Sequence, residues 1–269
     1  MPAPTPHRRF DRLEEWKLEP SGSSWFLRFR GARGIADHVV GALPRARALA
    51  DATADHRWPH RVRMDFAPPD GLEDFLRLLG EVVVIPVGSP GGVDGAVALD
   101  DHARPVREGS SELARTEHGG LLHLVKHGVG TRAEIDRAGR RLCAELAEVV
   151  LRHEWFVRST RLLPVPGHDP GRPATSVLLG LALGQELGLE VTPVADDRRV
   201  RKPARQMTPR EREDLLTAFR VDEDLSGRTV LVVDDTHRTG YTLAGVANAA
   251  RRAGADTVLG LTVTRNSRR

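Results

Sequence analysis

The C-terminal part of the chain alternates short apolar runs with amphipathic segments, and this alternation constrains the fold more than any other feature. The apolar runs have the length of buried strands, and the amphipathic segments have the period of helices. The expected strands cover residues 161–166, 190–194, 229–234 and 257–264, and the expected helices cover residues 121–125, 131–155, 173–187, 208–216 and 242–252. Strands joined by helices imply right-handed crossovers and a parallel sheet with helices on both faces.

Three of these helices have boundary signals. Thr131 lies three residues before Glu134, which is the spacing of a capping box. Gly188 and Gly254 follow helical segments and are expected to end them.

The N-terminal half mixes extended and helical signals without this regular alternation. Its expected strands cover residues 25–30, 62–66, 82–87 and 93–99, and its expected helices cover residues 35–52, with a break near Pro44, and 71–79. Residues 88–92 are rich in glycine and proline and favour a hairpin between the last two strands.

Length and polarity together predict two domains. The chain has 269 residues, of which 40% are hydrophobic, so it can bury a sizeable core. Residues 1–22 are rich in Pro, Ser and charge and are expected to form a loose N-terminal segment. Residues 23–105 are expected to form an α+β domain of unknown role. The polar stretch 100–111 is the expected boundary, and residues 112–269 form the domain with the parallel sheet.

The charge pattern gives weak support to a nucleic-acid partner. Forty basic residues nearly balance 37 acidic ones, which leaves a formal net charge of +3. Lysine occurs only at Lys17, Lys126 and Lys202, so arginine carries almost all of the positive charge. No block of basic residues is interleaved with aromatics, which make up 4% of the chain.

A single cysteine, Cys143, rules out a disulfide within one chain and any cysteine-based zinc cluster. We expect a reducing, cytoplasmic location, with Cys143 buried on a helix as a small hydrophobic residue. The polar start lacks the apolar run of a signal peptide, and no run approaches the length of a membrane span. A homo-oligomer is compatible with the sequence.

The strand over residues 229–234 ends in two adjacent carboxylates, Asp234 and Asp235. Ligands bind beyond the carboxyl ends of the strands of a parallel sheet, so both acids are expected at the binding edge. Two adjacent carboxylates there are costly unless hydroxyl donors, a metal or a cation meet them. Sugar hydroxyls would satisfy them, whereas the plain alternative is a solvated surface turn.

The residues that follow have the chemistry of a phosphate-binding loop. Glycine permits close approach of the backbone, threonines offer hydroxyls, and the start of the next helix supplies free N–H groups. The expected loop comprises Thr236, His237, Arg238, Thr239, Gly240, Tyr241 and Thr242. No Gly-Lys-Ser/Thr sequence occurs in the chain, so it is not a Walker loop.

Carboxylates for a ribose diol beside a phosphate loop describe a 5-phosphoribosyl group. Residues 230–242, VLVVDDTHRTGYT, resemble the phosphoribosyl pyrophosphate (PRPP) motif of type I phosphoribosyltransferases. In that motif, four hydrophobic residues precede two acidic ones and a Thr-Gly-x-Thr phosphate loop. The resemblance covers roughly residues 118–265 and implies a type I phosphoribosyltransferase-like parallel sheet flanked by helices, to which this chain adds the N-terminal α+β domain.

Two further segments resemble the ComF-like branch of that family. The turn with Gly167 and His168, followed by Arg172, is similar to a turn that holds pyrophosphate. A basic segment with Lys202 and Arg205 is similar to a loop that brings cations to the leaving group. Lys126, on the helix before the core, could reach an anion. For these residues the alternatives are an exposed histidine, a solvated basic face and helix packing.

The resemblance implies a cytoplasmic transferase of nucleotide metabolism that uses PRPP and Mg²⁺ to transfer a phosphoribosyl group to an unknown nitrogen acceptor. Asp234 and Asp235 would hold the ribose hydroxyls, directly or partly through the metal. No general base is identified. The chain lacks the cysteine-rich zinc module that is usual in the ComF-like branch. The alternatives are a non-catalytic regulator that binds PRPP or nucleotides, and a factor linked to DNA uptake or recombination.

Overall fold

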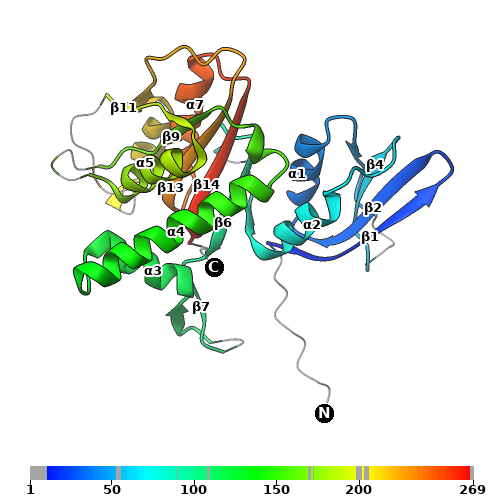
Figure 1. Cartoon of the computed structure of the whole chain (residues 1–269), viewed down its shortest axis with the longest axis horizontal. Coiled ribbons are helices and arrows are strands. Elements are labelled where there is room, and N and C mark those ends of the chain that lie inside the picture. The colour runs from blue at the N-terminus through cyan, green and yellow to red at the C-terminus, as the bar shows by residue number, and fades with distance from the viewer. Residues whose placement is uncertain are drawn as a thin grey trace.

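The computed structural model describes residues 11–52, 56–88, 90–107, 110–168, 171, 173–197, 202 and 206–266. Its centre is a six-stranded sheet (Figure 1). In spatial order the strands are β10 (Glu190–Val191), β9 (Arg161–Pro164), β13 (Thr229–His237), β14 (Thr257–Arg265), β6 (Gly95–Asp101) and β5 (Val83–Ile85). The first five pair in parallel and β5 is antiparallel, which confirms the predicted parallel sheet.

Helices cover both faces of this sheet, as the alternation predicts. One face packs against α3 (Glu117–His127), α4 (Arg132–Arg152) and α5 (Thr175–Leu187). The other packs against α7 (Tyr241–Arg252) and the short turn η3 (Asp214–Thr217), next to α6 (Pro209–Glu213). Successive residues of β13 separate the two cores, because Leu231 and Val233 join the first and Val230 and Val232 join the second.

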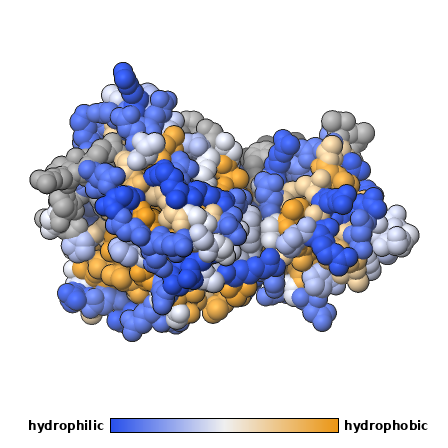
Figure 2. Space-filling view, turned by 90° about the horizontal axis from the view of Figure 1, so that it is seen from above, coloured by the Kyte–Doolittle hydropathy of each residue, from blue (hydrophilic) through white to orange (hydrophobic). Residues whose placement is uncertain are grey.

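A second, antiparallel sheet forms a smaller lobe beside the first (Figure 1), and Figure 2 shows the two lobes in contact. Its strands, in spatial order, are β1 (Leu13–Ser21), β2 (Ser24–Gly31), β4 (His60–Met64) and β3 (Arg47–Ala48). The helices α1 (Ile35–Ala42) and α2 (Leu72–Glu81) belong to this part of the chain. One buried cluster contains Phe29 of this lobe together with Leu146 of α4, so the two lobes share a core.

The prediction that residues 1–22 are loose is wrong for the part that the structure describes. β1 pairs with β2 along its length, with Trp16 opposite Phe29 and Leu18 opposite Leu27. Trp16 and Leu18 pack on the core and alternate with charged residues, which is the period of a half-buried strand. The charge and proline content of the segment hid this period.

The predicted assignment of residues up to 105 to an N-terminal domain is at odds with the sheet pairing. β5 and β6 form the predicted hairpin, but β6 also pairs in parallel with β14. Ala96, Val97 and Ala98 are fully buried, as expected for a strand covered on both faces. The polar stretch after Leu99 therefore marks the carboxyl end of a sheet strand, where β7 (Ala103–Pro105) and β8 (Leu113–Arg115) form a small hairpin.

Local signals predicted some helix ends well and one poorly. Thr131 forms the expected capping box with Glu134, and Gly188 ends α5 in the left-handed conformation. The helix expected over residues 35–52 ends at Ala42, at the break expected near Pro44, because proline disfavours helical backbone in the residue before it. Beyond the break, Arg47 and Ala48 form a short strand instead of a helix. The remaining short elements are η1 (Phe156–Arg158) and the antiparallel pair β11 (Ala195–Asp196) and β12 (Phe219–Arg220).

Cys143 is buried on α4, as predicted, and burial raises the pKa of its thiol. Among the described residues, no helix combines the length and apolar character needed to cross a membrane.

Two buried histidines lie where the lobes meet. Nδ1 of His38, on α1, lies 3.0 Å from Nε2 of His153, which follows α4. Phe75, Trp155 and Phe156 make ring contacts with the pair. Burial lowers the pKa of His38 to about 4, and burial together with the His38 charge lowers the pKa of His153. The fold therefore requires both imidazoles to be neutral.

We expect this pair to make the protein sensitive to acid. His38 has a pKa of about 4 when folded and an ordinary value of 6.5, so its contribution is complete above pH 6.5 and is lost as the pH falls toward 4. Each such group should reduce the free energy of unfolding by up to about 1.4 kcal/mol per pH unit in that window. Urea unfolding at several pH values gives the free energy of unfolding as a function of pH. Between pH 4 and pH 6.5 this free energy should change less with pH for His38→Gln than for the parent. Equal slopes would contradict this role.

Candidate active site

The carboxyl ends of four neighbouring strands bring polar residues to one edge of the sheet. In the pairing of β13 with β14, Asp234 lies beside Thr262 and Thr236 lies beside Thr264. Thr264 in turn lies beside Asp100 of β6. These are the positions at which open parallel sheets bind ligands.

The two predicted acids lie at this edge and have different surroundings. Asp235 lies on the face of β13 that packs against α3, and its Oδ2 accepts a bond of 2.7 Å from Nζ of Lys126. Asp234 is half-buried, and its Oδ1 accepts a bond of 2.8 Å from the backbone N–H of Asp235. The pairing of Lys126 with Asp235 is a contact that the sequence alone did not predict, although Lys126 was expected to reach an anion.

The predicted phosphate loop is shorter than expected. Thr236 and His237 continue β13 and pair with Thr264 and Arg265, so the chain bends only over residues 238–240. β13 and β14 stay paired up to His237 because β14 extends to Arg265. Arg238 is exposed, and Tyr241 and Thr242 form the first turn of α7.

Gly240 makes the turn into α7. It is the N-cap residue, with a φ of 79°, and no side chain caps the helix. The first N–H groups of α7 thus have no side-chain acceptor at the cap, which leaves the anion-binding chemistry of a helix start available.

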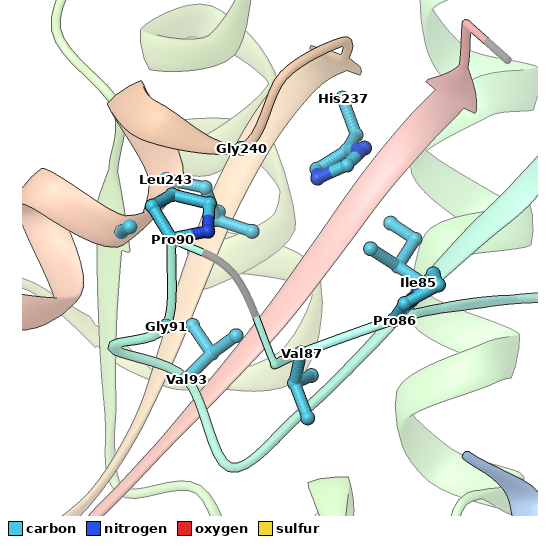
Figure 3. Close-up of a pocket in the computed structure, with 10 residues that line it drawn as sticks. Ile85, Pro86, Val87, Pro90, Gly91, Val93, His237, Gly240 and Leu243 are labelled. Carbon is cyan, nitrogen blue, oxygen red and sulfur yellow. The ribbon is translucent and has the colours of Figure 1, made fainter. Parts of the chain in front are cut away.

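A small pocket lies between the start of α7 and the loop that joins β5 to β6 (Figure 3). Its wall is apolar except for the imidazole of His237, and it is lined by residues that include Ile85, Val87, Pro90, Val93, Gly240 and Leu243. Burial and the nearby charge of Arg265 lower the pKa of His237 to about 4. Within the described chain, no group hydrogen-bonds its buried Nδ1. The imidazole that lines this pocket is therefore neutral.

Polar residues of β14 and of the turn after β6 extend the edge. The hydroxyls of Thr236 and Thr264 are 3.3 Å apart, and Oγ1 of Thr264 lies 3.4 Å from Nδ1 of His102. Sequence reasoning missed His102, because the residue fell in the expected linker. A signal was available, since Asp100, Asp101 and His102 follow an apolar run as Asp234 and Asp235 do.

Asp100 and Asp101, the second acidic pair, form ion pairs within the protein. Asp100 accepts bonds from Arg12 and Arg104, and Asp101 pairs with Arg265. Burial would raise the pKa of Asp100, but a bond from His118 and the two guanidinium charges lower it. Asp100 therefore has little remaining capacity for a ligand.

The predicted pyrophosphate residues are described only in part. Gly167 and His168 follow β9, and Val165 next to them still donates its backbone N–H to Val233 at 2.9 Å. His168 is exposed and Gly167 is half-buried. Nζ of Lys202 donates to Oε1 of Glu211, on α6, at 2.7 Å. The other two residues, Arg172 and Arg205, lie outside the described residues.

No protein-family model and no curated protein matches the chain. Similar solved structures include three phosphoribosyltransferases. The purine enzyme from Pyrococcus horikoshii Ot3 is 20% identical over 51% of this chain and 85% of its own, with a TM-score of 0.30. The adenine enzyme from Saccharomyces cerevisiae is 14% identical over 72% and 89%, with a TM-score of 0.36. The orotate enzyme from Aeropyrum pernix is 18% identical over 61% and 74%, with a TM-score of 0.33. These similarities are distant, so the case for a function rests on the side chains of this chain.

Gly240→Ala should damage the turn into α7. A Cβ there would lie 3.0 Å from Cδ of Pro90 and 3.1 Å from Nε2 of His237, on a backbone with positive φ. Gly227 also has positive φ, at 72°, but a Cβ added to it would meet nothing within 4 Å, so Gly227→Ala is the matched control. We expect losses of about 2–3 kcal/mol for Gly240→Ala and about 1–2 kcal/mol for the control in urea unfolding. Equal losses would show that the pocket contacts do not matter.

Proposed function

We propose that this chain is a phosphoribosyltransferase that uses PRPP and Mg²⁺ to transfer a 5-phosphoribosyl group to a nitrogen acceptor and releases pyrophosphate. The observation that carries the proposal is the placement of Asp234 and Asp235 near the carboxyl end of β13. Two more strand residues and one short bend separate them from the uncapped start of α7. Carboxylates and helix amides at this separation in the chain match the two ends of a phosphorylated pentose.

The acid pair would hold the ribose. Carboxylates accept bonds from the 2- and 3-hydroxyls, and their charge stabilises the positive charge that develops on the sugar as pyrophosphate leaves. The amides of α7, with the hydroxyls of Thr239 and Thr242, would bind the 5-phosphate. Catalysis would then come mainly from positioning and charge.

Lys126 prepares this site in the free protein. Two adjacent carboxylates repel each other, and the ammonium of Lys126 offsets that repulsion at Asp235. Its side chain is 42% exposed, so it can move aside or turn toward a bound anion without unpacking α3.

The acid pair also fits Mg²⁺. No group of three or more histidine, cysteine or acidic side chains that could hold a metal occurs among the described residues. Magnesium is commonly held by one or two carboxylates together with substrate phosphates, and Asp234 and Asp235 can supply the protein's share. When bound, the ion would neutralise charge on the pyrophosphate. Gly167 and His168, at the end of the neighbouring strand β9, remain the proposed contacts for that group, with Arg172, Lys202 and Arg205.

Replacing both acids should abolish uptake of the sugar. Asp234→Asn with Asp235→Asn removes two charged acceptors, each worth about 1.5–3 kcal/mol, so calorimetry with Mg²⁺ should show affinity for PRPP reduced about a hundredfold or more. Asp196→Asn with Asp197→Asn neutralises an adjacent acidic pair at the end of β11, which pairs with β12 in a separate two-stranded sheet, and should leave the affinity unchanged. Retained uptake in the first variant would refute the proposal.

Turnover distinguishes an enzyme from a regulator. We expect the protein to release pyrophosphate from PRPP when the correct nitrogen acceptor is added. Tight, magnesium-dependent binding of PRPP without release, across purines, pyrimidines and aromatic amines, would favour a regulator. Salt-dependent binding of single-stranded DNA would instead favour the factor linked to DNA uptake.

A further inference from the structure

Five cationic or imidazole side chains gather beside the acid pair, on the side away from β9. We call His102, Arg115, His123, Lys126 and His127 the basic cluster. Three of them lie on α3, which packs against β14 and β6, and the other two flank the β7–β8 hairpin. The sequence separates them into two segments, and the fold brings those segments together.

Backbone contacts fix the relative position of these segments. Ala103 pairs with Arg115, which places Arg115 next to His102 in the hairpin. The N–H of Thr116 donates to the carbonyl of His102 at 3.2 Å. Gly119 of α3 lies so close to that carbonyl that a Cβ there would be only 2.1 Å from its oxygen. The first turn of α3 is therefore held directly against the turn that carries His102.

Positive charge in this cluster has few acids to balance it. Lys126 pairs with Asp235, but Arg115 has no ion pair among the described residues. The rings of His123 and His127 contact each other, with centroids 4.7 Å apart. Burial, followed by the charges of Arg115, Lys126 and His123, lowers the pKa of His102. Burial and the charges of Arg115 and His127 likewise lower the pKa of His123.

Such an arrangement favours an anion. Side chains that disfavour each other's positive charge are stabilised when a negative group binds among them. The neighbouring Arg12 and Arg265, by contrast, have carboxylate partners at the same edge of the sheet. Arg115 is thus a charged donor without an ion pair among the described residues, and it lies with Lys126 and the three imidazoles next to the proposed sugar site.

We propose that the basic cluster binds an anionic group, a carboxylate or phosphate, on the nitrogen acceptor. The inference rests on the proposed function. In a displacement at the anomeric carbon, the nucleophile can approach from the face opposite to the leaving group. The turn proposed for pyrophosphate follows β9, on one side of β13. His102 follows β6, beyond β14 on the other side, and α3, which carries three residues of the cluster, contacts β14 and β6. An acceptor held there could reach the sugar from the open face.

A matched pair of probes tests this inference. Uracil-6-carboxylate and uracil share a ring and differ in the carboxylate. With the protein saturated with PRPP and Mg²⁺, we expect the carboxylate probe to bind more tightly by about tenfold or more, the equivalent of about 1.4 kcal/mol. Arg115→Gln with His123→Gln should remove that preference and leave PRPP affinity within about twofold, because both residues lie outside the acid pair and the phosphate loop.

Arg132→Gln is the control, since Arg132 is an exposed arginine on α4, and it should keep the preference. Equal binding of the two probes by the parent protein, or a preference that survives in the double variant, would overturn the inference.

Binding of inorganic pyrophosphate is a second measurement on the same variants. If the double variant loses affinity for pyrophosphate and keeps its preference between the probes, the cluster serves the leaving group instead. If the parent does not bind PRPP, the proposed function fails, and the same probe comparison without PRPP still decides the anion site.

Discussion

Parallel pairing of β9, β13, β14 and β6 is the constraint on which the rest of the structure depends. It aligns four carboxyl ends at one edge, so that short polar segments far apart in the sequence become neighbours. The buried runs of these strands leave almost no polar group in the interior, and the charged residues are confined to the strand ends. The same pairing gives the proposed sugar site a rigid base.

Charges at this edge divide into two groups with different roles. Asp100 pairs with Arg12, and Asp101 pairs with Arg265. Arg265 also pairs with Asp11, so these buried or half-buried pairs join the start of β1 to the ends of β6 and β14. Breaking such a pair leaves an uncompensated charge, which makes it a structural contact. Among the described residues, the ion-pair partner of Asp235 is Lys126, whose side chain is exposed. The first group holds the edge in shape, and the second can exchange its partner for a ligand.

Sequence patterns predicted those parts of the fold in which local and global preferences agree. The run before Asp234, the capping box at Thr131 and the glycine after α5 each carry their signal within a few residues. The pairing of β6 with β14 has no local signal, because the apolar pattern of a buried strand does not specify the sheet to which the strand belongs. Lys126 and His102 were missed as neighbours of the acids for a similar reason, since only the packing of α3 on the sheet sets that contact. β1 was not predicted, because the Pro, Ser and charge content of residues 1–22 obscured the alternation of apolar and charged residues along the strand.

The order of strands in the sheet also bears on how the chain is made. β6 is synthesised early, yet its parallel neighbour β14 comes from the far end of the described chain. Until that end has left the ribosome, the buried apolar residues of β6 have an unpaired edge, and β5 can protect only the other side. Long-range parallel pairing of this kind forms slowly. Because the two lobes share one buried core, neither side of that core is complete until β14 has been made, and an exposed strand edge in that interval favours association with another chain.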